Sequence, residues 1–451
     1  MPQYERGALS PRILHVGVGG FHRAHMAVYT DDVAATSGGG WGIRGVGLLD
    51  ADRRMAETLR KQDTLYTVVE RDTGVARPRV VGSIVDYALA ARRPERFDEL
   101  VADAGVEILS LTITEGGYSL AKPNPTIEAV VSALDARRNA GAAPLTILSC
   151  DNVPGNGDVA RAAVVATAEQ RSAELLGYVE RSCTFPNSMV DRITPRTTDA
   201  DRAWLRDAVG VDDDWPVVCE DFRQWVVQDR FAAGRPAWEE VGVLFTDRVH
   251  DWELYKLRLL NASHSCLAYL SALAGAVYVD EAMAIPAVRR YLDARIRTEA
   301  IPTLTEIPGH PATEYAAAAL HRFENTGVRD QVARLCSDGA AKLRNFLVPT
   351  IESQLELGGP IELSTLTLAA WSRYLATVAD GERAPDSAGE HVVALARAST
   401  AEPLAFLELD ETFTPQLREH PRFRAVYEQS SRNLEAFGPL EAVELALRAA
   451  A

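Results

Sequence analysis

Over the first 150 residues, short apolar runs alternate with longer segments in which apolar residues recur at helical spacing. This alternation is typical of a parallel β-sheet whose strands are joined by crossover helices. The pattern predicts strands in this region at residues 13–16, 45–49, 80–84, 106–112 and 145–150.

Beyond this region the pattern becomes irregular and then helical. Four prolines interrupt residues 185–245, and the apolar runs 217–219 and 241–245 are expected to add strands to the same sheet. From residue 252 onward the spacing predicts helices near 265–277, 285–300, 328–358, 362–379 and 436–450. The polar stretch 379–390 is expected to be a surface loop between helices.

A chain of 451 residues exceeds what one hydrophobic core usually organises, so two domains are expected. The change of pattern places an α/β domain over residues 1–245 and a mostly α-helical domain over residues 246–451.

Charge and cysteine content exclude several classes of function. The net charge of −16 argues against nucleic acid or an anionic membrane as a partner, because both attract an excess of Lys and Arg. The five cysteines are scattered without a Cys-x-x-Cys pair, which indicates neither a disulfide framework nor a structural zinc site. No charged-then-apolar leader or bilayer-length apolar run is found. We expect a cytoplasmic protein, a monomer or a small homo-oligomer.

Residues 13–25 combine a short apolar strand, a glycine turn and a helix start, as at the opening of a dinucleotide-binding unit. Gly17 and Gly19 match the first two glycines of such a turn, which let the backbone approach a pyrophosphate. Gly20 comes early, and His22 stands where the third glycine is expected. The α/β domain is therefore expected to be of the Rossmann type, with an extended sheet.

The next predicted strand leads to Asp50 and Asp52. An acidic group there would accept hydrogen bonds from the adenine ribose of NAD. Asp is also common at helix starts, so the alternative is that these residues only cap the helix through Met55 and Leu59.

A second chemical feature lies near the middle of the chain. Lys256, Asn261 and His264 fall within an arc of roughly 140° on a helix that turns about 100° per residue. The residues between them are largely apolar, so this helix is expected to be buried on more than one side. A hydrogen-bonded set that only fixes helix packing would explain the three polar residues equally well.

Together, the glycine turn, including Phe21, and the central helix resemble the mannitol dehydrogenase family of long-chain polyol dehydrogenases. Other segments similar to the family's motifs follow in the same order over nearly the whole chain, at residues 112–118, 149–152, 156–157, 185–195 and 334–342. The resemblance implies an NAD-dependent enzyme that acts on a sugar alcohol or its ketose.

Oxidation of a secondary alcohol needs a base for the hydroxyl proton and donors for the developing alkoxide. The Cys and His placements offer no set of metal ligands, so Lys256 can be the base if burial lowers its pKa toward neutrality. Asn261 and, by the resemblance, Asn152 would donate amide N–H groups to the alkoxide. Glu253 would relay the proton to water or form an ordinary helix ion pair. His264 would hold a substrate hydroxyl, orient the base or be structural.

By the resemblance alone, Asp191, Arg334 and Lys342 bind the polyol. The expected reaction interconverts D-mannitol and D-fructose, with D-arabinitol as a further substrate. The nearest alternative is a hexuronate reductase acting on fructuronate or tagaturonate, in which Arg334 and Lys342 would clamp the carboxylate. An alternative of another class is an NAD(H)-binding sensor without catalysis.

Overall fold

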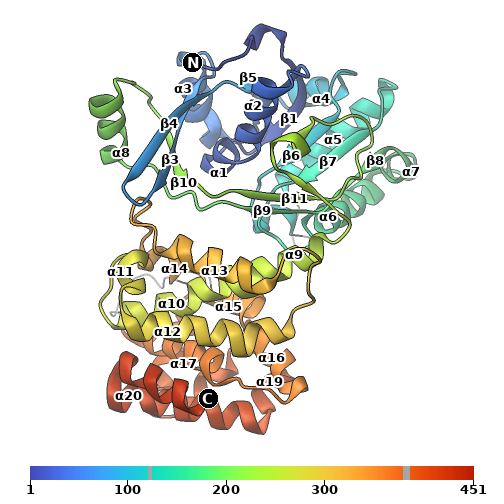
Figure 1. Cartoon of the computed structure of the whole chain (residues 1–451). Coiled ribbons are helices and arrows are strands. Elements are labelled where there is room, and N and C mark those ends of the chain that lie inside the picture. Colours follow the sequence, from blue (N-terminus) through green and yellow to red (C-terminus); the bar gives the residue numbers. More distant parts are fainter. Residues whose placement is uncertain (120–123, 379–385, 387, 451) are drawn as a thin grey trace. The chain divides into compact units, whose positions relative to one another are not determined.

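The computed structural model describes residues 1–119, 124–378, 386 and 388–450. The chain divides into two compact units, Met1–His250 and Asp251–Ala451, and each is described by itself (Figure 1). The division falls inside α9 (Val249–Tyr255), whereas the boundary predicted after residue 245 falls at the end of β12 (Leu244–Phe245). The polar loop predicted at 379–390 lies mostly outside the described residues.

The first unit is built on a six-stranded parallel sheet with the strand order β5-β2-β1-β6-β7-β8. Its strands are β1 (Ser10–Val16), β2 (Trp41–Gly47), β5 (Ile84–Leu89), β6 (Ile108–Leu111), β7 (Leu145–Ser149) and β8 (Cys183–Thr184). The predicted Rossmann-type sheet is confirmed.

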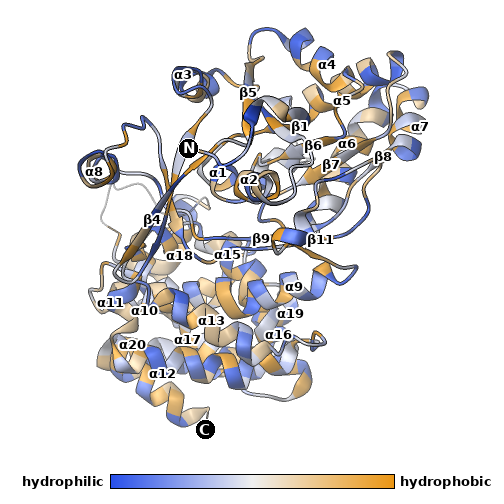
Figure 2. Cartoon of the chain, turned by 45° about the horizontal axis from the view of Figure 1, so that its top comes forward, coloured by the Kyte–Doolittle hydropathy of each residue, from blue (hydrophilic) through white to orange (hydrophobic). Residues whose placement is uncertain are grey.

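Alternate residues of the strands face two separate cores. In β1, Ile13 belongs to one hydrophobic cluster, and its neighbours Leu14 and Val16 belong to the other, as the two-residue period of a strand requires. The helices α1 (Gly20–Ala24), α2 (Met26–Thr36) and α3 (Arg53–Lys61) contribute to the first cluster. The second cluster contains side chains of α4 (Pro94–Ala102), α5 (Pro125–Asn139), α6 (Asn156–Arg171) and α7 (Ala173–Ser182), and α4 shows both hydrophobic and hydrophilic residues in Figure 2.

The prediction that runs 217–219 and 241–245 extend the parallel sheet is wrong. β10 (Val217–Glu220) pairs with β3 (Tyr66–Asp72), which forms an antiparallel hairpin with β4 (Val75–Val81). A second small sheet contains β12, β11 (Gln224–Val227) and β9 (Ser188–Asp191). The predicted strand 80–84 is divided between β4 and β5. β4 follows β3 after a two-residue turn at Thr73 and Gly74, which is enough for an antiparallel hairpin. A parallel neighbour in the six-stranded sheet would need a much longer crossover connection.

The second unit is mostly helical, as predicted. Its helices are α10 (Ala262–Leu273), α11 (Val279–Met283), α12 (Pro286–Arg295), α13 (Ala312–Phe323), α14 (Val332–Leu335), α15 (Gly339–Phe346), α16 (Val348–Leu357), α17 (Glu362–Ala376), α18 (Glu390–Ala398), α19 (Pro415–Glu419) and α20 (Pro421–Ala449). α17 is central to the packing: Trp371 is fully buried, and the helix contacts both α10 and α20. Gly438, with φ +76°, and Pro439 kink α20.

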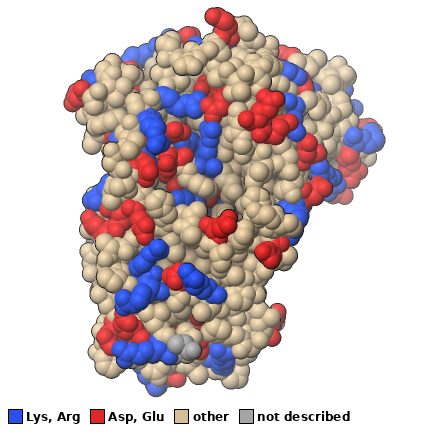
Figure 3. Space-filling model, in the orientation of Figure 1, with Lys and Arg blue, Asp and Glu red and all other residues tan. Residues whose placement is uncertain are grey.

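Each of the five cysteines is buried as a free thiol. Among the described residues, no helix is long and apolar enough to cross a membrane. On the face drawn in Figure 3, acidic and basic side chains are interspersed.

Candidate active site

Gly17 turns the chain sharply at the carboxyl end of β1. Its φ is +91°, and a Cβ here would lie 2.0 Å from the carbonyl oxygen of Thr112, so only glycine fits. The Thr112 hydroxyl donates to the Gly17 carbonyl at 2.6 Å and therefore accepts from Nε2 of His15 at 3.0 Å. Ser110 Oγ lies 2.8 Å from the other ring nitrogen of His15. This chain of hydrogen bonds fixes the orientation of the turn.

His22 explains the departure from the three-glycine pattern. Its ring stacks on His15, with 3.4 Å between the ring centroids, and is 1% exposed. The ring therefore fills the space between α1 and β1 that a third glycine would leave for closer packing. Burial lowers the pKa of His15 to about 3, so its ring is neutral near pH 7. Gly19 and Gly20 begin α1, and Phe21 stacks on His25 at 5.0 Å.

Asp50 and Asp52 lie in a 3₁₀ turn (Asp50–Asp52) after β2 and have different environments. The carboxylate of Asp52 accepts from the backbone N–H of Leu49 at 2.9 Å, which is the capping arrangement. The Asp50 side chain is 61% exposed and accepts from Nε of Arg92 at 3.0 Å. This hydrogen bond holds the pKa of Asp50 below its usual value. Asp50 is thus the more accessible of the two acidic groups.

Asn152 follows β7 and is exposed, next to a buried carboxylate that anchors the loop. Asp151 accepts from the backbone N–H groups of Ile113 and Thr114 at 2.9 and 2.8 Å, and from the hydroxyl of Tyr118 at 2.6 Å. Thr114 has a φ of +64°, which the two backbone hydrogen bonds stabilise. Asp151 therefore joins the loop after β6 to the loop that carries Asn152.

The structure thus brings the predicted cofactor residues and Asn152 to one edge of the parallel sheet, because β1, β2 and β7 all end there. Asp191 stands in β9, whose first residue, Ser188, donates to the carbonyl of Ser149 at the end of β7. Asp191 is the last residue of β9, is 3% exposed and pairs with Gln224 of the small sheet.

In the second unit, the candidate catalytic helix is not a regular α-helix. Lys256 to Asn261 form a π-helical segment, η6 (Lys256–Asn261), between α9 and α10. A π turn bonds residues five apart, so Lys256 and Asn261 lie on one side of the helix, and the roughly 140° arc of an α-helix does not apply. Lys256 and Glu253 are 7% and 5% exposed. The ring of His264 stacks on Phe323 of α13, with 4.0 Å between centroids.

Arg295 forms a hydrogen bond to the backbone of this π segment. It is fully buried, and its guanidinium donates to the carbonyl of Arg258 within the segment at 2.9 Å. Its Nε donates to Ser364 Oγ at 3.2 Å. Glu299 accepts from the backbone N–H groups of Leu363 and Ser364, both at 2.7 Å, at the start of α17. Burial raises the pKa of Glu299 to about 7.

Arg334 and Lys342 lie near each other in the same unit. Arg334 forms a two-pronged ion pair with Asp330, with Nε 2.7 Å from Oδ1. The ammonium of Lys342 donates to the carbonyl of Leu335 at 3.3 Å. Burial and the charge of Arg334 lower the pKa of Lys342.

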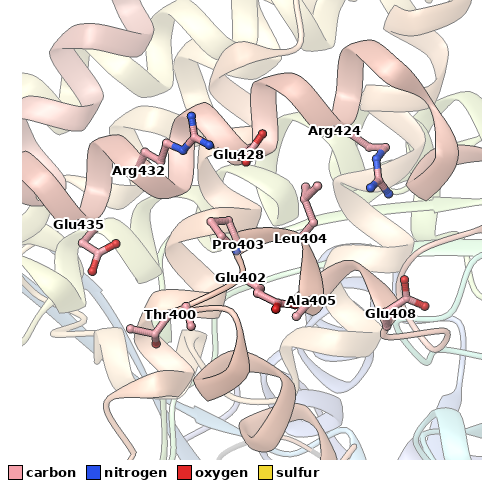
Figure 4. A pocket seen from close by; sticks show the side chains of 11 residues that line it. Thr400, Glu402, Pro403, Leu404, Ala405, Glu408, Arg424, Glu428, Arg432 and Glu435 are labelled. Carbon is pink, nitrogen blue, oxygen red and sulfur yellow. Dashed lines mark hydrogen bonds and ion pairs between the residues drawn. The ribbon is translucent and has the colours of Figure 1, made fainter.

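A surface cavity of about 690 Å³ lies between the 3₁₀ segment Pro403–Glu408 and α20 (Figure 4). Arg424, Glu428 and Arg432 line it along one side of α20. None of the predicted site residues lines it, so it is not the candidate active site. Among the described residues, no group of three or more His, Cys, Asp or Glu side chains could hold a metal ion.

Several supporting residues were missed by sequence reasoning. Asp330 stands four residues before Arg334, a spacing that signals a helical ion pair. Asp151 lies inside the motif that contains Asn152. Arg295 offers a weaker signal, as a charged residue within an apolar periodic run.

Comparison with known proteins adds independent findings. The model of the mannitol dehydrogenase Rossmann domain matches residues 11–240, and that of the mannitol dehydrogenase C-terminal domain matches residues 248–435. The mannitol 2-dehydrogenase of Phaeosphaeria nodorum is 39% identical, covering 97% of this chain and 82% of the relative. That of Cereibacter sphaeroides is 42% identical, covering 83% and 82%.

Two solved structures are similar over almost their whole length. The ternary complex of Pseudomonas fluorescens mannitol 2-dehydrogenase with NAD and D-mannitol has a TM-score of 0.90 and 39% identity, covering 99% of this chain and 96% of that one. A D-sorbitol dehydrogenase in substrate-free form has a TM-score of 0.88 and 33% identity, covering 98% and 96%.

Proposed function

The chain belongs to the mannitol dehydrogenase family, and from this premise we propose that it is an NAD-dependent polyol dehydrogenase that interconverts D-mannitol and D-fructose. The observation that carries the proposal is the likeness, over nearly all of both chains, to the mannitol 2-dehydrogenase solved with NAD and D-mannitol.

The residues of the first unit fit NAD. The glycine turn leaves no room for a side chain at Gly17, and its carbonyl is held in place by Thr112. Such a turn suits the close approach of a pyrophosphate to the backbone of Gly19 and Gly20. Phe21, Asp50 and Asp52 complete the proposed cofactor site, in which Asp50 accepts from the adenine ribose. NAD, when bound, supplies the hydride acceptor.

We assign the proton chemistry to Lys256. It is buried, and its amine, when neutral, can take the proton of the substrate hydroxyl. The amides of Asn261 and Asn152 donate to the developing alkoxide. Glu253, three residues before the lysine, passes the proton to water, and His264 orients the base or a substrate hydroxyl. The π segment supports this assignment, since π turns occur frequently at functional sites.

Asp191, Arg334 and Lys342 are assigned to the remaining hydroxyls of the polyol. Together they offer several donors and one carboxylate acceptor, which suits a chain of hydroxyl groups. Each buried polar group left unmatched costs about 1 to 3 kcal/mol, enough to select among stereoisomers. We expect D-mannitol and D-arabinitol to be oxidised well, and glycerol and ethanol poorly.

A polyol panel tests this proposal. The enzyme is assayed with NAD and NADP by the absorbance of the reduced nicotinamide, before and after prolonged chelation, because we propose catalysis without a metal. Activity with D-mannitol that survives chelation supports the proposal. Reduction of D-fructuronate far above that of D-fructose would replace it with the hexuronate alternative.

A further inference from the structure

Arg334 forms an ion pair with Asp330, four residues before it in the sequence. Its side chain is 50% exposed, whereas the side chain of Asp330 is 7% exposed. Nε of Arg334 lies 2.7 Å from one carboxylate oxygen of Asp330, and Nη2 donates to the other. This is the two-pronged geometry that gives the strongest guanidinium–carboxylate pairs. Two of the five guanidinium N–H groups are thereby used, and the others remain as donors.

The position of Asp330 is fixed by its backbone. Its carbonyl accepts from the N–H of Val279 at 2.9 Å, and the next residue, Gln331, forms a β-bridge with Tyr278. The backbone that carries this carboxylate is therefore tied to the start of α11.

The surroundings of Lys342 are also balanced in charge. Burial lowers the pKa of this lysine most, and the charge of Arg334 lowers it further, whereas the carboxylates of Asp338 and Asp386 raise it. Asp338 and Asp386 therefore offset part of the positive charge around Lys342, as Asp330 does for Arg334. A clamp for an anionic ligand would need an excess of positive charge.

We infer that Asp330 is a specificity-determining residue: it neutralises Arg334, so that the site takes the hydroxyls of a neutral polyol or ketose and rejects a hexuronate carboxylate. This inference rests on the proposed function, in which Arg334 contacts the substrate. Specificity would come from a repulsive group placed against the wrong ligand, while the remaining N–H groups still bind hydroxyls.

The test compares D-fructose with D-fructuronate, which bears a carboxylate in place of the terminal hydroxymethyl group. Values of kcat/KM with NADH are measured for the parent and for Asp330→Asn. Where fructuronate turnover is undetectable, its inhibition constant against fructose reduction is used. We expect the fructuronate-to-fructose ratio to rise at least about tenfold in Asp330→Asn.

The chain offers a matched control in the pair of Asp280 with Arg329. Their side chains are 9% and 47% exposed, close to the 7% and 50% of Asp330 and Arg334. Asp280→Asn should leave the substrate ratio unchanged. An equal rise in both variants would overturn the inference, because the effect would then be a general loss of negative charge.

The double variant Asp330→Asn/Arg334→Gln covers the case in which Asp330→Asn does not fold, because the double variant leaves no arginine without its carboxylate partner. If Asp330 neutralises Arg334, removing both charges keeps the ratio within about threefold of the parent. A fall of about tenfold or more would show that Arg334 acts as an unneutralised anion clamp and would overturn the inference. A parent that reduces neither ketose would instead refute the proposed function.

Discussion

In the Rossmann-type unit, the candidate cofactor residues and Asn152 follow the carboxyl ends of strands, in turns and helix starts, whereas in the helical unit Lys256 and Asn261 stand inside a helix. The Gly17 turn is held by neutral groups, His15 and the Thr112 hydroxyl, and the loop that carries Asn152 is held by the Asp151 side chain, which accepts from backbone N–H groups. In the helix, the buried guanidinium of Arg295 donates to the carbonyl of Arg258 within the π segment.

The difference follows from what each element leaves unpaired. The turn after β1 needs only a particular backbone conformation, which a glycine and a small hydroxyl side chain provide. A π turn displaces carbonyls from their usual partners, and a buried guanidinium with several N–H groups can satisfy one of them. We therefore expect changes to the groups that hold the Gly17 turn to affect cofactor binding, and changes to the groups that hold the π segment to affect the chemical step.

The largest expected effect concerns the base. Lys256→Ala should lower kcat for mannitol oxidation by about 10² to 10⁴-fold, the usual contribution of a general base. The dissociation constant of NADH, measured by fluorescence titration, should change little, because the proposed cofactor site lies in the other unit. Lys61→Ala is the control, since Lys61 is an exposed lysine paired with Asp214. Turnover of Lys256→Ala within tenfold of the parent would remove the assignment.

A crossed pair of variants tests the comparison itself. Arg295→Lys should lower kcat by up to about 100-fold, because a shift of the π segment misplaces the base, and should leave KM for NAD unchanged. Thr112→Val should raise KM for NAD with a smaller effect on kcat, because the Gly17 carbonyl loses its donor. Thr112→Ser keeps the hydroxyl and should restore the parent value. If both variants change the same constant, the division of roles between the two units is wrong.

The groups that hold the Gly17 turn and the π segment also show how much of the site could be predicted from the sequence. The strand before Gly17 and the turn itself were predictable, because a short apolar run followed by glycines is a local feature of the sequence. The π segment was not, because apolar periodicity reports only the average helix. The group that stabilises it, Arg295, lies 37 positions from Arg258 in the sequence. Runs 217–219 and 241–245 were placed in the wrong sheet because apolar composition does not select a partner strand.

The two units should also respond to pH in opposite directions. Burial lowers the pKa of His15 and His25 to about 3, so the folded first unit binds fewer protons than the unfolded chain between about pH 3 and 6.5. The contribution of these two histidines to stability is full above about pH 6.5 and is lost as the pH falls toward 3. Burial raises the pKa of Glu299 to about 7, so its contribution is present below about pH 4.5 and is lost as the pH rises through 7.

Hydrogen exchange followed by mass spectrometry at pH 5 and pH 7.5, corrected for intrinsic rates, measures this contrast. On going from pH 7.5 to pH 5, the free energy of opening measured for β1 peptides should fall by about 2 kcal/mol for each buried histidine. Peptides at the start of α17 should lose about 2 to 3 kcal/mol on going from pH 5 to 7.5. Glu299→Gln should abolish only the second change. The same pH slope in both units would contradict the assignment.

The smallest expected effect concerns cofactor choice. It tests Asp50, the exposed carboxylate in the proposed cofactor site of the Rossmann-type unit. Asp50 would repel the 2′-phosphate of NADP, but its partner Arg92 and the nearby Arg53 would attract that phosphate once the carboxylate is removed. Asp50→Ala should therefore raise the NADP-to-NAD ratio of kcat/KM by about tenfold or less, without changing kcat for mannitol with NAD. The matched control is Glu57→Ala, an exposed carboxylate on α3. Equal use of both cofactors by the parent would show that Asp50, with its charge offset by arginine, does not select NAD.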